Sequence, residues 1–100
     1  MPKAPATTER VLPTRIGRYR VLAELGQGGM AVAYLARAGG VGGFERLFAI
    51  KMIHEHLCRE PAFVSMFLNE ARLVARIHHP NVIPVYEVDV DSGRYFLSLD

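Results

Sequence analysis

The sequence has no tryptophan, only one cysteine and no long apolar run. Cys58 has no partner for a disulfide within the chain, which fits a reducing compartment, and we expect a cytoplasmic protein. Because no stretch of about 18 apolar residues occurs, we expect no membrane segment. Residues 1–15 lack the apolar core of a secretory signal peptide.

A large excess of either charge is also missing. Lys and Arg number 12 and Asp and Glu number 10, a net charge of +2 in 100 residues. Nucleic-acid-binding domains usually have a basic stripe interleaved with exposed aromatic residues, and the sequence shows none. We therefore expect no nucleic-acid partner. With 50% hydrophobic residues the chain can form a core, but its length is about one domain, too short for most complete two-lobed or barrel enzymes.

The residue pattern indicates several strands and one helix. Residues 1–16 are expected to form a flexible leader, and 17–100 a folded domain. Alternation predicts a strand at 18–25, and a short apolar run predicts a strand at 47–53 that is buried on both faces. Two more strands are expected at 82–88 and 95–99. Residues 30–38 are apolar and suit either a helix or a strand. In the first strand the residues expected to share one face are Tyr19, Val21, Ala23 and Leu25.

The helix is predicted to begin at Pro61 and to end before Pro80. Its apolar stripe follows helical spacing and consists of Phe63, Phe67, Val74 and Ile77. The turn Asp91-Ser92-Gly93 predicts a hairpin between the last two strands. Pro84 cannot donate a main-chain hydrogen bond, so its strand is expected at the edge of the sheet.

A glycine cluster, Leu25-Gly-Gln-Gly-Gly-Met-Ala31, directly follows the first strand. Glycine lets the backbone turn sharply and bring amide groups close to a phosphate. The motif fits a dinucleotide-binding turn if a helix follows, or a hairpin covering a nucleotide triphosphate if a strand follows. It also fits a plain hairpin turn with surplus glycine. The motif alone does not decide among these three.

Two charged residues lie within otherwise apolar segments, one in the predicted strand 47–53 and one in the apolar stripe of the predicted helix. Lys51 is the single charge in 47–53, so its ammonium must either pair or extend out from an edge strand. Glu70 lies at the centre of the predicted apolar stripe, where it either faces the core or sits at a hydrated rim. We expect the two to pair. A buried ion pair of this kind is poor evidence for stability. We interpret it instead as a pair that holds another group in position.

Together, the glycine cluster, the strand lysine and the helix glutamate resemble the N-terminal lobe of a protein kinase, in particular the bacterial serine/threonine kinases of eukaryotic type. The resemblance spans residues 17–100. Its matching segments are residues 25–31 with Tyr34-Leu-Ala36, Phe48-Ala-Ile-Lys51, Phe67-Leu-Asn-Glu-Ala-Arg72 and His79-Pro-Asn-Val-Ile83. It implies an α+β fold, a five-stranded antiparallel sheet with one main helix, in which residues 30–38 are the second strand.

The resemblance also implies a function, the binding of ATP for phosphoryl transfer to Ser or Thr of a protein substrate. It implies catalytic roles for Lys51, which would contact the α- and β-phosphates, and for Glu70, which would hold Lys51. The nucleotide-binding residues it implies are Leu25, Gly26, Gln27, Gly28, Gly29, Met30, Ala31, Ala33, Ala49, Lys51, Leu99 and Asp100. Ala31 replaces the family's third glycine, and Ala33 replaces a valine, which thins the roof over the adenine.

The family's H-R-D and D-F-G motifs have no counterpart in residues 1–100. The Mg²⁺ that accompanies ATP would therefore be held by the missing C-terminal lobe. We expect the 100-residue chain alone to be inactive, to bind ATP weakly and to associate readily. The alternatives are a pseudokinase-like regulatory or protein-interaction module and a dinucleotide-binding oxidoreductase fragment. Alternating His54, His56 and Cys58 suggest a metal only weakly, and we expect no metal site.

Overall fold

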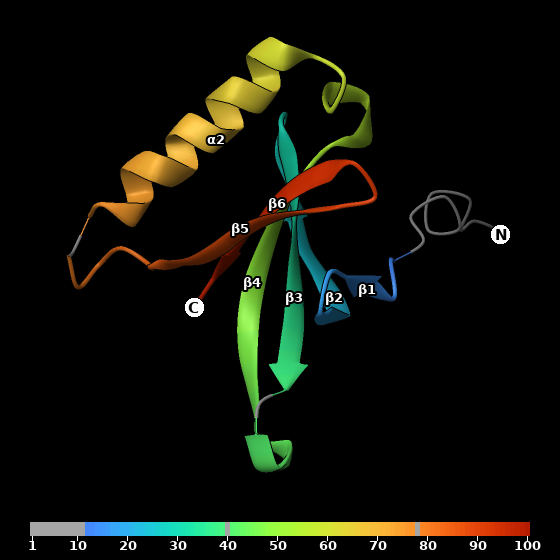
Figure 1. The fold of residues 1–100 in the computed structure, drawn as a ribbon, viewed down its shortest axis with the longest axis vertical. Coiled ribbons are helices and arrows are strands. Elements are labelled where there is room, and N and C mark those ends of the chain that lie inside the picture. The colour runs from blue at the N-terminus through green and yellow to red at the C-terminus, as the bar shows by residue number, and fades with distance from the viewer. Residues whose placement is uncertain (1–11, 40, 78) are drawn as a thin grey trace, which may run out of the picture.

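A computed structural model describes residues 12–39, 41–77 and 79–100. They form a six-stranded antiparallel sheet in the order β1-β2-β3-β4-β6-β5, with one main helix beside it (Figure 1). The α+β class is confirmed, with one strand more than predicted. The elements are β1 (Arg15–Ile16), β2 (Tyr19–Gln27), β3 (Ala31–Gly39), the 3₁₀ turn η1 (Val41–Gly43), β4 (Glu45–Ile53), the 3₁₀ turn η2 (Glu55–Leu57), α2 (Pro61–Ala75), β5 (Val85–Asp91) and β6 (Arg94–Leu99).

The additional strand, β1, falls within the predicted leader, most of which lies outside the described residues. Ile16 pairs with Tyr19 and is 1% exposed, so the end of that segment is part of the sheet. Between them Gly17 has φ +58°, a left-handed conformation that favours glycine. Its amide donates to Asp91 Oδ2 at 2.7 Å, which joins the β1–β2 turn to the far hairpin of the same sheet.

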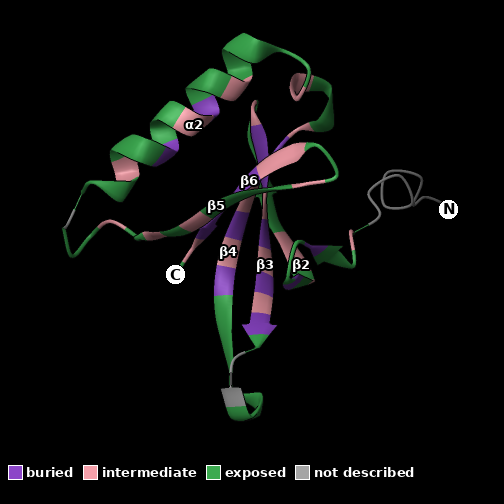
Figure 2. Cartoon of the chain, viewed as in Figure 1, coloured by how far each residue is buried: buried purple, intermediate pink, exposed green. Residues whose placement is uncertain are grey.

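The β3–β4 hairpin is the longest continuous pairing of the sheet. Its register runs without a bulge from Ala31 opposite Ile53 to Gly39 opposite Glu45. The ambiguous segment 30–38 is therefore a strand, as the kinase resemblance implies. Alternate residues of both strands point into a first core, which Figure 2 shows as bands of buried and less buried residues. This core contains Ile16, Tyr19, Val32, Tyr34, Ala36, Ala38, Phe48, Ile50, Met52 and Phe96.

Helix α2 covers one end of the sheet and completes a second core. Phe67 and Ala71 are its buried residues, and they pack with Ala31, Ile53 and Leu97. The helix begins at Pro61, as predicted. The predicted stripe was wrong at its ends, because Phe63 is 39% exposed and Ile77, 46% exposed, lies beyond the end of the helix at Ala75.

The strand predictions also need correction in detail. Two bulges in β2 break its alternation, so Leu25 is 57% exposed. β4 is not buried on both faces along most of its length, because on the face opposite the first core Leu47 is exposed and Lys51 is partly exposed. Ile53, at the end of the strand, is the buried residue on that face. β5 begins after Pro84 and lies at the sheet edge. The predicted β5–β6 turn is confirmed at Ser92-Gly93, where both residues have positive φ, as in a type I′ hairpin.

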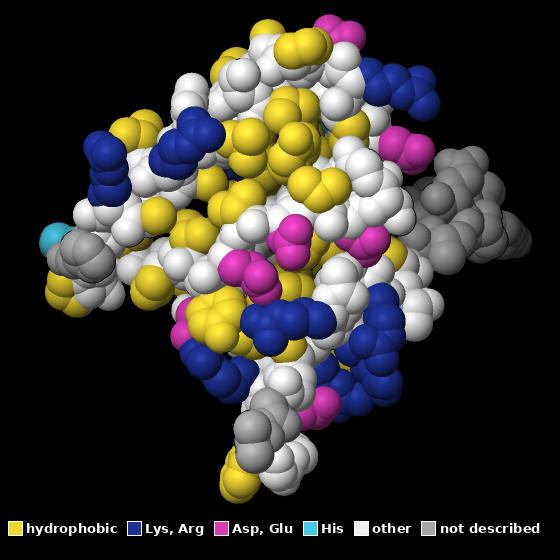
Figure 3. Space-filling model, viewed as in Figure 1, with side chains coloured by type: hydrophobic (Ala, Val, Ile, Leu, Met, Phe, Trp, Pro, Cys, Tyr) yellow, Lys and Arg dark blue, Asp and Glu magenta, His cyan; other side chains and the backbone are white. Residues whose placement is uncertain are grey.

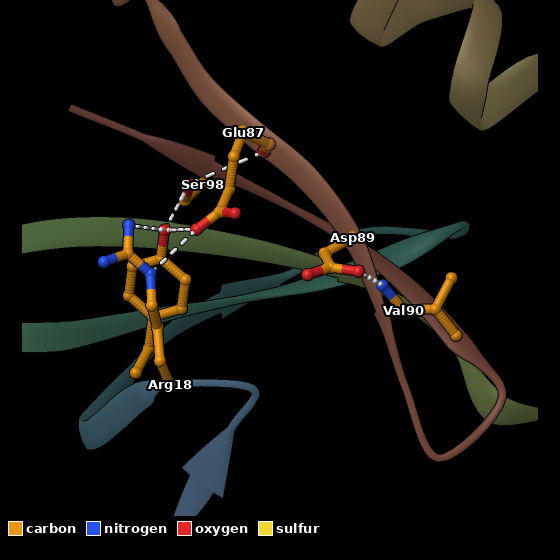
Figure 4. A network of polar contacts seen from close by, with 6 residues as sticks. Arg18, Glu87, Asp89, Val90 and Ser98 are labelled. Atoms are coloured by element: carbon orange, nitrogen blue, oxygen red, sulfur yellow. Dashed lines mark hydrogen bonds and ion pairs between the residues drawn. The ribbon is translucent and has the colours of Figure 1, made fainter.

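A polar network, buried at Tyr19 and Ser98 and partly exposed at Arg18 and Glu87, connects distant strands of the sheet (Figure 4). Tyr19 and Ser98 are both 0% exposed, and their side-chain oxygens lie 2.9 Å apart. The Tyr19 hydroxyl also donates to the carboxylate of Glu87, which accepts from Arg18 Nε at 3.1 Å. The network joins β2 to β5 and β6, strands far apart in the sheet order.

The surface combines apolar and basic regions. Figure 3 shows hydrophobic side chains gathered between α2 and the neighbouring strands, whereas Lys and Arg side chains lie both beside α2 and toward the opposite end of this face. Large apolar residues exposed on α2 include Met66 at 57% and Leu73 at 62%. Within the described residues, no helix is long and apolar enough to cross a membrane.

Tyr19→Phe should lower the free energy of unfolding by about 1–3 kcal/mol, because it deprives the buried Ser98 hydroxyl and Glu87 of a partner. Urea denaturation of both proteins measures the loss. Tyr95→Phe is the matched control, since Tyr95 is partly buried and its hydroxyl takes no part in this network. Equal losses in the two variants would contradict the assigned role of the network.

The stability difference between the original chain and Tyr19→Phe should also depend on pH. Burial, and then the bond to Glu87, raise the pKa of Tyr19 above its usual value of 10.0. A group whose pKa is raised by folding contributes to stability fully when the pH lies below its pKa in the unfolded chain. This contribution is lost as the pH rises through its pKa in the folded protein. The difference should therefore shrink above about pH 10. A difference that widens there, in urea denaturation across the alkaline range, would refute the assignment.

Candidate functional site

The predicted site residues occupy neighbouring positions on one face of the sheet. Gly26 of β2 pairs with Ala33 of β3, which in turn pairs with Lys51 of β4. Ala49, two residues before Lys51, pairs with Leu99 of β6. Because side chains alternate along a strand, these positions lie on the face opposite the first core.

A cavity of about 480 Å³ opens on this face, within the range of about 300–1,000 Å³ usual for small-molecule sites. It is bordered by the glycine turn, the sheet and Glu70 of α2. The predicted nucleotide-binding residues that line it are Gly26, Gln27, Gly28, Gly29, Met30, Ala31, Ala33, Ala49, Lys51 and Leu99. Val32 and Ile50 also border it, and sequence reasoning missed them; since their side chains are buried in the first core, they contribute main chain.

Two predicted residues lie outside this lining. Leu25 is 57% exposed, at a bulge between Glu24 and Gly26. Asp100 pairs with Arg46, and its amide donates to the Pro84 carbonyl at 3.1 Å. Leu25 is turned out by the bulge in β2, and Asp100 follows the end of β6. Alternation of residue types alone reveals neither the bulge nor the end of the strand.

Lys51 and Glu70 do pair, with Nζ and Oε1 3.1 Å apart. Their side chains are 41% and 63% exposed, so the interpretation of Glu70 as facing the core was wrong, and the hydrated rim is correct. The reason is the rotation of α2. Ala71 points into the second core, and the residue before it therefore lies on the flank of the helix.

The ion pair stands where two cavities meet. A second cavity of about 370 Å³ shares Lys51, Glu70 and Leu99 with the first. The rest of its lining is mostly apolar and comes from α2, residues 81–85 and β6. The Lys51–Glu70 pair thus lies between a glycine-lined cavity and an apolar cavity. Each of the two charged side chains borders each of the two cavities.

The glycines of the turn are not required by the chain's own packing. A Cβ at Gly26 or Gly29 would have no atom within 4 Å, and one at Gly28 would lie 3.8 Å from the Ala31 carbonyl oxygen. None of the three has a positive φ. Their lack of side chains instead leaves main-chain groups open to the cavity, a cradle suited to an anion.

The remaining alternatives can be compared with this geometry. A dinucleotide-binding turn requires a helix after the glycines, but β3 follows them, so that alternative was wrong. Of the weak metal candidates, His54 places Nε2 2.8 Å from the Gly28 carbonyl oxygen. Within the part of the chain that the structure describes, no group of three His, Cys, Asp or Glu side chains could hold a metal ion.

The fold and the paired Lys51 and Glu70 define the small lobe of a protein kinase. The kinase domain of PknI from Mycobacterium tuberculosis matches 90% of this chain with a TM-score of 0.67 and 24% identity, over 36% of that domain. A C20A_R136N double mutant of the same domain matches with a TM-score of 0.68. At this identity the likeness establishes the fold.

The family follows from relatives in sequence, although no family model matches the chain. Tyrosine-protein kinase MasK of Myxococcus xanthus is 40% identical over 84 residues, and the DNA damage-responsive serine/threonine-protein kinase RqkA of Deinococcus radiodurans is 40% identical over 85. Serine/threonine-protein kinase Pkn1 of Myxococcus xanthus is 34% identical over 86. These matches include 84%, 83% and 86% of this chain but 13%, 12% and 12% of the relatives. The chain belongs to the bacterial protein kinases of eukaryotic type and corresponds to their N-terminal lobe.

Glu70→Gln should lower the free energy of unfolding by less than about 1 kcal/mol, because exposed ion pairs contribute little to stability. Breaking a buried pair would cost about 3–5 kcal/mol. Urea denaturation distinguishes the two. Glu45→Gln is the matched control, since it removes another exposed pair, with Arg37 at 3.5 Å. A loss of about 3 kcal/mol or more, in Glu70→Gln alone, would show that the pair is buried in solution.

Proposed function

We propose that this chain is the ATP-binding lobe of a protein kinase that transfers the γ-phosphoryl group to Ser or Thr of a protein substrate. The supporting observation is the glycine turn. Its three glycines are needed neither for backbone conformation nor for packing, and they border the same cavity as Lys51. A turn that leaves this space open fits a ligand that approaches the main chain closely.

The chemistry of the lining fits a nucleotide triphosphate. Lys51 provides a cation on the wall of the cavity, and the turn provides main-chain amides, both of which favour phosphate oxygens. Ala33, Ala49 and Leu99 form an apolar surface on the same sheet face, which fits the adenine ring. The two halves of the cavity thus match the two halves of ATP.

Lys51 and Glu70 have different roles in this proposal. Lys51 contacts the α- and β-phosphates, and Glu70 fixes the position of its ammonium through the 3.1 Å ion pair. Because the pair is half exposed, water competes for both charges until a ligand covers them. Even so, the pair with Glu70 orients Lys51 before the nucleotide binds, which reduces the entropy lost on binding.

Protein kinases use Mg²⁺ together with ATP, and the metal neutralises charge on the phosphates. The donor set here does not fit that metal, because Glu70 is the one carboxylate in the lining of the glycine-bordered cavity and it is paired with Lys51. We assign Mg²⁺ no ligand within this chain. The named relatives include both serine/threonine and tyrosine kinases, and the Ser/Thr specificity proposed here follows RqkA and Pkn1.

Gly29→Ala tests the proposal through the space that the turn leaves open. The new methyl group meets no atom of the chain, so stability should stay the same or rise by up to about 1 kcal/mol. The affinity for ATP should fall about tenfold or more, the equivalent of one charge-assisted hydrogen bond. Isothermal titration with ATP measures the affinity, and urea denaturation measures stability.

Gly39→Ala is the matched control, because a Cβ there meets atoms only at 4.0 Å and lies at the far end of the β3–β4 hairpin. It should leave ATP affinity unchanged. Equal ATP affinity in all three proteins would favour the plain hairpin turn with surplus glycine and would contradict the proposal.

A further inference from the structure

His54 directly follows β4 and contacts the glycine turn at two points. Its ring Nε2 lies 2.8 Å from the carbonyl oxygen of Gly28, and its main-chain amide donates to the carbonyl of Met30 at 3.0 Å. Between these points, the turn is closed by a hydrogen bond from the Gly28 amide to the Ala31 carbonyl at 2.8 Å. One residue thus holds both sides of the turn.

The chemistry of this contact determines its direction. A carbonyl oxygen only accepts hydrogen bonds, so Nε2 of His54 has the hydrogen and donates it. The residue is itself held in place, because its carbonyl accepts from the Leu57 amide at 3.0 Å and from Cys58 Sγ at 3.4 Å. Its ring also stacks on His56, with centroids 5.5 Å apart and planes 16° apart.

We infer that His54 is a positioning residue that sets the distance of the glycine turn from the sheet. The role of this distance in nucleotide binding rests on the function proposed above, whereas the contact itself does not. Glycines at 26, 28 and 29 have no side chains to anchor the turn, so its position depends on bonds to its main chain. The amide–carbonyl closure within the turn shapes it but does not attach it to β4.

The positions of the partners explain why one ring can have this effect. Ala31 pairs with Ile53, the last residue of β4, so the sheet ladder ends where the turn begins. Beyond that pair, the two bonds from His54 continue the attachment for three more residues, back to Gly28. The attachment would hold the amides of the turn near the position in which they meet a phosphate, which lowers the ordering cost of binding.

Amide hydrogen exchange of the ¹⁵N-labelled chain, measured without nucleotide, tests the contact. His54→Phe keeps a ring that can stack on His56 but removes the donor. The Gly28 amide should then exchange about threefold to tenfold faster, the range expected for one lost hydrogen bond. His54→Gln places an N–H near the position of Nε2 and should restore most of the protection. His56→Phe, the matched control, should leave Gly28 unchanged.

Unchanged exchange at Gly28 in His54→Phe would overturn the inference. So would equal acceleration at Gly28 and at the buried core residue Ile50, because this would indicate general loss of stability. ATP titration of the same variants gives a separate result. The Phe variant should bind ATP about threefold to tenfold more weakly and the Gln variant nearly normally. If the unaltered chain binds no ATP, the proposed function fails, whereas the exchange data still decide the role of His54.

Discussion

The unbroken pairing of β3 with β4 is the constraint on which the rest of this structure depends. Each of these strands has nine residues, and their ladder has no bulge, so every second residue on both strands faces the first core. A shift by one residue would bury Lys51 and expose Ile50. The same ladder ends at Ala31 and Ile53, both in the second core, and so it also determines where α2 can pack.

The two faces of this hairpin have different tasks. One face is filled by large side chains and closed by the Tyr19–Glu87–Ser98 network, which joins strands from opposite ends of the sheet. The other face has small residues such as Ala33 and Ala49 and leaves a cavity. The same face also contains Ala31, Ile53 and Leu97 of the second core, which α2 covers. It is therefore packed at one end and open at the other, where it leaves room for a ligand and holds an ion pair that is only half covered.

Much of the fold and the site was predictable from local chemistry. Pro61 marked the start of the helix, Ser92-Gly93 marked a turn, and a lone lysine in an apolar strand indicated a partner. Other features were not. The alternation of residues 30–38 is obscured by alanines, which suit helix and strand equally, and the motif order of the kinase family was needed to assign them. β1 is too short to show a pattern, and the bulges of β2 leave no mark in the composition.

The sequence by itself determined the chemical groups of the site and their order along the chain. The reason is that each group belongs to one residue type: glycine leaves the main chain open, lysine provides a cation and glutamate provides a carboxylate. Tertiary structure decided how these groups are exposed. The rotation of α2 placed Ala71 in the core and Glu70 at its rim, since the helix could bury one flank only against the sheet. Tertiary structure also decided that His54 contacts Gly28. These residues are 26 positions apart in the chain, and the β3–β4 hairpin brings them together.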